Sequence, residues 1–80
     1  MKLSEVSNKN MRVKVAAFNQ DYNTKIIDRL KNLGIVENKI ISVLHSLPFG
    51  GPVVVHVGSC VFSLSREVAQ WVEVELLVES

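Results

Sequence analysis

Cys60 and His56 are the side chains whose types could supply a nucleophile and its general base. A thiol catalyst needs such a base within hydrogen-bonding reach. The Gly58-Ser59 pair predicts a two-residue reversal, which would place His56 opposite Val61 and leave Cys60 opposite Val57, on the other face of the sheet. We therefore expect Cys60 to be a buried structural cysteine, and we expect no catalytic residue in this chain.

The two histidines, His45 and His56, are the candidate metal ligands. If Ser46 pairs with Val53 across a hairpin, the two rings lie diagonally on the outer face of the sheet, with their backbones about 7–8 Å apart. That distance would allow them to share a weakly bound metal ion. A protein metal site usually takes three or more His, Cys or carboxylate ligands, and no spacing here matches a zinc signature. We therefore expect no metal or other cofactor, and only His45 and His56 are kept as candidate ligands.

A segment dense in turn residues, Leu47-Pro48-Phe49-Gly50-Gly51-Pro52, lies between two β-rich segments. It does not resemble a phosphate-binding loop, because no helix follows it whose N-terminal amides could hold an anion. Two prolines around two glycines favour one defined conformation, which would present Leu47 and Phe49. These two side chains either close the open end of a barrel or contact a partner protein.

The elements that must position these residues follow from the spacing of apolar side chains. We expect strands over 12–18, 39–46, 53–57, 60–64 and 72–76, a helix over 23–33 and a helical turn over 65–70. In the last strand Glu73 and Glu75 alternate with valines, which indicates a solvated face rather than an acid–base pair. The inner face of the second hairpin is expected to consist of Val53, Val55, Val57, Cys60, Phe62 and Leu64.

The helix over 23–33 has recognisable ends. Asp21 or Asn23 can cap its start. Gly34 suits the left-handed position just past its end, where Ile35 can fold back on Leu30 as in a Schellman motif. Its apolar stripe consists of Ile26, Ile27, Leu30 and Leu33.

Apolar residues on the predicted outer faces are the main physical indication of a binding surface. If they lie together, they form a patch large enough for a partner or for self-association of the chain; alternatively, one of the helices packs over them. The residues are Leu44, Val54, Val61 and Trp71.

The charged residues are unevenly distributed along the sequence. Residues 1–39 contain eight basic and four acidic residues, whereas residues 40–80 contain one basic and four acidic residues. This asymmetry either orients a partner or is only solvated surface.

Length and composition limit the class of protein. Eighty residues make one domain, expected over 1–80, whose core is too small for a deep catalytic cleft. A net charge of +1 is too low for nucleic-acid binding. The lone Cys60 fits a reducing compartment, and no signal peptide or membrane span is recognisable, so we expect a cytoplasmic protein without direct membrane insertion. The predicted fold is mainly β: a small SH3-like barrel of about five strands, with one short α-helix in the first connection and a helical turn before the last strand.

Three segments resemble, in order and in spacing, elements of one known family. Residues 28–35 are similar to its Arg-Leu-x-x-Leu-Gly-hydrophobic element, residues 48–52 to its Pro-hydrophobic-Gly-Gly-Pro loop, and residues 64–69 to its Leu-Arg-Arg-x-x-Ala element. Over about residues 10–76 the chain thus resembles the FeoA-like domain, named for ferrous iron transport protein A. Ser65 departs from the family pattern, which often has a basic residue there, and Asn38 replaces the usual glycine of a turn. Asn38 can still take the left-handed conformation.

The resemblance implies a non-enzymatic domain of the bacterial cytoplasm that supports Fe(II) uptake. Its implied partner is the membrane ferrous iron permease, whose cytosolic end is a GTP-binding domain. The residues that we expect to contact this partner are Arg29, Leu47, Phe49, Gly50, Gly51 and Trp71. One alternative is a metal-sensing or regulatory module, because FeoA-like domains also occur on metal-dependent repressors, although no helix-turn-helix segment accompanies this one. Another is a polyproline-binding SH3-like domain, but such domains use clustered aromatic residues, which here are scattered.

Overall fold

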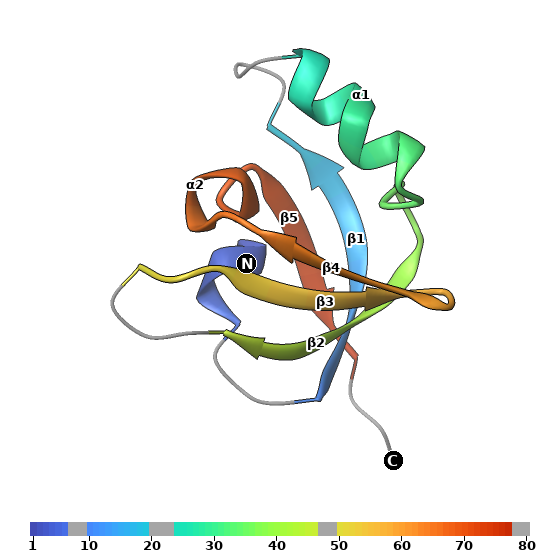
Figure 1. Cartoon of the computed structure of the whole chain (residues 1–80). Helices are drawn as coiled ribbons and strands as arrows, with labels where there is room; N and C mark the ends of the chain where they lie inside the picture. The colour runs from blue at the N-terminus through green and yellow to red at the C-terminus, as the bar shows by residue number, and fades with distance from the viewer. Residues whose placement is uncertain (7–9, 20–23, 47–49, 78–80) are drawn as a thin grey trace.

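The computed structural model describes residues 1–6, 10–19, 24–46 and 50–77 (Figure 1). In these residues five antiparallel strands form one curved sheet in the order β4-β3-β2-β1-β5, so that β4 and β5 are its edges. The fold is mainly β and SH3-like, as predicted. Its elements in chain order are the 3-10 helix η1 (Leu3–Glu5), β1 (Met11–Phe18), α1 (Thr24–Asn32), β2 (Ile40–Ser46), β3 (Val53–Val57), β4 (Cys60–Leu64), α2 (Arg66–Ala69) and β5 (Val72–Leu76).

The core lies on the concave face of the sheet, where the strand alternation directs the branched side chains. Valine and isoleucine favour strands because their branched side chains pack well on a pleated surface. The inward residues of β1, β2 and β3 are all buried, including the predicted valines of β3, and β5 contributes Val72 and Val74. Those of the first three strands are Val13, Val15, Ile41, Val43, Val53, Val55 and Val57.

Helix α1 lies in the first connection, as predicted, and its C-terminus is a Schellman motif. Gly34 has a φ of +95°, its N–H donates to the Lys31 carbonyl at 3.0 Å, and the N–H of Ile35 donates to the Leu30 carbonyl at 3.0 Å. A Cβ at Gly34 would also lie 3.3 Å from Cγ1 of Val57, so the helix end fits closely against β3. The predicted N-caps Asp21 and Asn23 lie outside the described residues.

The segment that precedes β1 contributes to the core, which the sequence analysis did not predict. Leu3 is fully buried and Val6 is nearly so. The carbonyl of Met1 accepts a hydrogen bond of 2.7 Å from the N–H of Val74, and Lys2 forms a β-bridge with Glu73. This N-terminal segment therefore lies along the outer side of β5 and covers that edge of the sheet.

Candidate partner-binding surface

A groove of about 240 Å³ opens between α1 and the segment that runs from the end of β4 into α2. Ile26 of α1 and Leu33, just after its end, are half-buried and form part of the wall, while the more deeply buried Ile27 and Leu30 anchor the helix on the core. The groove is mostly apolar, and the basic group in it is Arg29. The residues that line it are Ile26, Arg29, Leu30, Leu33, Ser63, Leu64, Ser65 and Val68.

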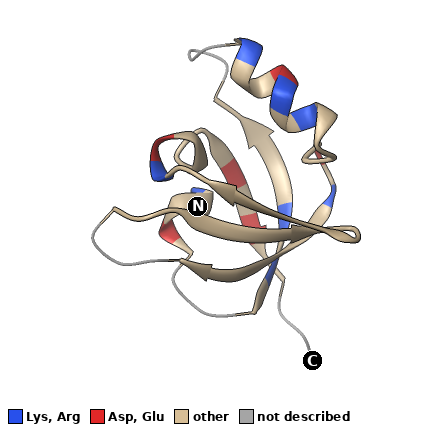
Figure 2. Cartoon of the chain, viewed as in Figure 1, with Lys and Arg blue, Asp and Glu red and all other residues tan. Residues whose placement is uncertain are grey.

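Arg29, one of the predicted partner-binding residues, is exposed and lies in this groove. Helix α1 carries Lys25, Arg29 and Lys31 and one acidic residue, Asp28, and Figure 2 shows further acidic residues on β5 and near the N-terminus. In the described part of the chain no carboxylate forms an ion pair with Arg29. Its guanidinium group is therefore available for a carboxylate from another molecule.

Gly50 and Gly51, also predicted, lie near α2 and are held there by Arg66. Gly50 is exposed with a φ of +77°, which glycine adopts without strain. The Arg66 guanidinium donates hydrogen bonds to the Gly51 carbonyl at 3.1 Å, to the Ser4 carbonyl at 2.7 Å and to Oγ of Ser46 at 2.8 Å. Arg66 thus joins the glycine pair, η1 and the end of β2 in one cluster.

The sequence analysis missed this role of Arg66. The available signal was that Arg66 is the only basic residue after Lys39, in a segment with a predicted N-cap. That N-cap is present: Oγ of Ser65 accepts a hydrogen bond of 3.2 Å from the N–H of Val68. Because Ser65 and Val68 also line the groove, α2 connects the groove to the Gly50-Gly51 turn.

Leu47 and Phe49, the predicted tip of this loop, lie outside the described residues. Trp71 was expected on the outer face, and this was wrong: its side chain is only 6% exposed. The error has a physical cause, because Trp71 precedes β5 and lies in the turn after α2, where strand alternation does not apply. The backbone N–H of Trp71 donates to the Val68 carbonyl at 3.0 Å, and the backbone carbonyl of Trp71 accepts from the N–H of Asn19 at 2.8 Å.

Cys60 is exposed, so the prediction that it is buried was also wrong. The predicted pairing itself is correct, since Cys60 lies opposite Val57 and His56 lies opposite Val61. Gly34 packs against the side chain of Val57. Cys60, by contrast, lies at the turn end of the edge strand β4, whose residues are exposed near the turn and become buried only at Leu64. The thiol of Cys60 and the imidazole of His56 are therefore not opposite each other, as predicted, although Cys60 is exposed and not buried.

His45 and His56 lie on neighbouring strands, with a β-bulge between them. Ser46 pairs with Val53, as assumed, but the register shifts between Val43 and His45, so that His56 pairs with Ser42. Around these histidines, and elsewhere in the described ranges, no group of three or more His, Cys, Asp or Glu side chains could hold a metal ion.

The predicted outer apolar patch is smaller than expected because Trp71 is buried. Val61 is 57% exposed, while Leu44 and Val54 are half-buried. Leu44 falls at the bulge of β2, where the alternation of faces is interrupted. The most exposed member of the set is thus Val61 on the edge strand β4.

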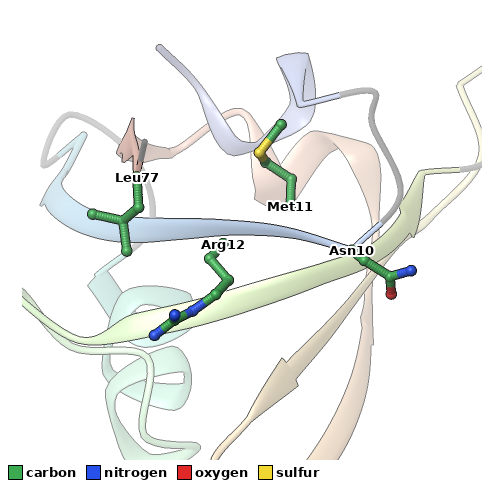
Figure 3. A pocket seen from close by; sticks show the side chains of 4 residues that line it. All are labelled: Asn10, Met11, Arg12 and Leu77. Carbon is green, nitrogen blue, oxygen red and sulfur yellow. The ribbon is translucent and has the colours of Figure 1, made fainter. Parts of the chain in front are cut away.

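A second hollow, of about 220 Å³, lies at the start of β1, where Leu77 follows β5 (Figure 3). The N–H of Leu77 donates to the Arg12 carbonyl at 3.1 Å. Figure 3 shows Met11 directed toward η1 and Arg12 to the opposite side of the strand, so these side chains do not converge on one point.

No helix in the described segments is long and apolar enough to cross a membrane.

Comparison with curated proteins gives no match. Among solved structures, the FeoA protein of Chlorobium tepidum is similar, with a TM-score of 0.84 and 28% identity, covering 98% of this chain and 71% of that one. A crystal structure of an iron uptake regulatory protein (FeoA) has a TM-score of 0.81 and 26% identity, covering 96% of each chain.

A manganese-dependent transcriptional repressor has a TM-score of 0.83 at 22% identity, which shows a common fold alone; the similarity covers 96% of this chain and 41% of the repressor. The sequence model of the FeoA domain matches residues 1–76. Because this match spans nearly the whole chain, the protein belongs to the FeoA domain family.

Proposed function

We propose that this protein is a cytoplasmic accessory protein of bacterial ferrous iron uptake, which acts by binding the cytosolic GTP-binding part of the membrane Fe(II) permease. The observation that carries the proposal is the FeoA domain match over residues 1–76, together with the similarity to an iron uptake regulatory protein (FeoA). The role is binding rather than catalysis, which fits a cysteine and a histidine that do not face each other.

The groove beside α1 supports a protein partner. Interfaces combine an apolar centre with a few charged or polar groups at the rim, and arginine is enriched among the residues that dominate binding energy. Here Ile26, Leu33 and Val68 supply apolar wall and Arg29 supplies the cation. We propose Arg29, Gly50 and Gly51 as partner contacts, and retain Leu47 and Phe49 as proposals from the sequence.

An NMR titration of the ¹⁵N-labelled protein with the permease's GTP-binding region, and separately with Fe(II), tests this function. We expect the GTP-binding region to shift the amide signals of Arg29 and of residues 63–65. Fe(II) alone should shift few signals. Shifts confined to His45 and His56 with Fe(II), and none with the protein, would contradict the proposal and favour the metal-sensing alternative.

A further inference from the structure

The free edge of β4 is the feature from which we draw a further inference, which rests on the proposed function. Within the described segments the backbone of β4 is hydrogen-bonded to β3 alone. The two-residue turn at Gly58-Ser59 closes with a Val57–Cys60 pair, and bonded and non-bonded pairs alternate along an antiparallel ladder. Val61 and Ser63 therefore direct their N–H and C=O groups away from β3.

This edge lacks the devices that usually prevent a sheet from pairing with another chain. Natural edges carry charged side chains, prolines, bulges or a covering segment. The sequence of β4, Cys-Val-Phe-Ser-Leu, has no charge and no proline, and its five pairs with β3 are in continuous register. Val61 is 57% exposed on this strand. An extended segment of a partner could therefore pair with β4 without breaking a backbone hydrogen bond that the described residues make at this edge.

The groove lies where such a segment would end. Helix α1 is on the side of β4 opposite β3 (Figure 1), and Ser63 and Leu64 form one wall of the groove that α1 closes. A strand added to β4 would thus place a side chain between Leu64 and the apolar face of α1, with Arg29 beside it. An apolar side chain fits that wall, and a carboxylate next to it would pair with Arg29.

We propose that β4 and the α1 groove together hold an extended segment of the permease's cytosolic part by β-strand addition. The segment carries an apolar side chain for the groove and an acidic residue for Arg29. In this binding mode the backbone hydrogen bonds supply affinity, and the pockets for alternate side chains supply specificity.

Calorimetry with the permease's purified GTP-binding region tests the backbone part of the proposal. Val61→Pro removes an N–H that points away from β3, so the ladder is kept, as prolines on edge strands are tolerated there. We expect a loss of affinity of roughly tenfold or more. The matched control Val61→Thr keeps the N–H, is also β-branched, and should bind like the wild type.

The groove is tested with charge reversals on one helix. Arg29→Glu should weaken binding by roughly tenfold, because it places like charges together. Lys31→Glu is the control, since Lys31 lies over the Phe18 ring, 5.6 Å from its centroid, and does not line the groove. It should change the affinity far less than Arg29→Glu does.

The outcomes separate this inference from the proposed function. If wild-type protein does not bind the GTP-binding region, the proposed function fails and the inference fails with it. If it binds, but Val61→Pro and Arg29→Glu bind equally well, the function stands and the docking site is elsewhere. If Val61→Pro abolishes self-association in sedimentation velocity without changing affinity for the partner, β4 pairs with a second copy instead. Should Val61→Pro fail to fold, protection of the wild-type Val61 and Ser63 amides on binding decides the question.

Discussion

The two edges of the sheet differ in what covers them. On β5, Glu73 and Glu75 place carboxylates along the strand, the N–H of Val74 bonds to the Met1 carbonyl, and the segment beginning with Leu3 packs beside it. On β4 there is no charge, and the strand borders a groove. Charges and a covering segment stop a sheet from adding a further strand. Among the described residues, one edge is thus covered by the N-terminal segment, whereas the other pairs with β3 alone and is bordered at one end by the α1 groove.

The covering of β5 gives the largest expected effect on stability. Leu3→Ala removes a fully buried side chain, and we expect the free energy of unfolding to fall by about 2–5 kcal/mol. Urea denaturation followed by circular dichroism measures it. Val61→Ala on the open edge is the control and should change stability by no more than about 0.5 kcal/mol. Equal losses in the two variants would remove the difference between the edges.

Two arginines near α2 sharpen the same comparison. Arg66→Met leaves the Gly51 and Ser4 carbonyls without their donor, and should lower the free energy of unfolding by about 1.5–3 kcal/mol. Arg29→Met should cost less than about 0.5 kcal/mol in stability while weakening partner binding. Denaturation and calorimetry of both variants measure these effects. Our account of the groove is wrong if Arg29→Met destabilises the fold as strongly as Arg66→Met.

The smallest effect is expected at the junction of β4 and α2. Ser65→Ala removes the N-cap of α2, whose hydroxyl oxygen accepts the N–H of Val68, and should cost about 1 kcal/mol. Ser63→Ala, two residues earlier on the open edge, should be close to neutral. Thermal unfolding of both variants provides the measurement. A neutral Ser65→Ala would show that α2 does not depend on this cap.

What could be predicted from the sequence depended on how local the physical cause was. Strand alternation and the end of α1 were correct because Gly34 and the valine pattern act within a few residues of themselves. The turn at Asn38 was also correct: its φ is +70°. The exposure of Cys60 and of Trp71 was predicted wrongly. At a β-turn, or just after a helical turn, the exposure of a residue depends on which other elements pack over it, and the local sequence does not show this.

Other parts of the surface could not be read from local patterns. Arg66 bonds to Ser4, Ser46 and Gly51, which are separated from it in the sequence by 62, 20 and 15 positions. No periodic pattern of residues indicates such distant contacts. The N-terminal segment has too few apolar residues for a periodic pattern, although Leu3 is fully buried. The extent of the single domain over 1–80, and the contacts of Leu47 and Phe49, stay predictions.

Amide hydrogen exchange tests the open edge most directly, because it reads the backbone N–H groups themselves. In the free protein we expect the amides of Val61 and Ser63 to exchange at least about tenfold faster than that of Val74, which is bonded to Met1. Adding the permease's GTP-binding region should slow exchange at Val61 and Ser63 and leave Val74 unchanged. Binding that leaves Val61 and Ser63 unprotected, or that protects Val74 instead, would contradict the account.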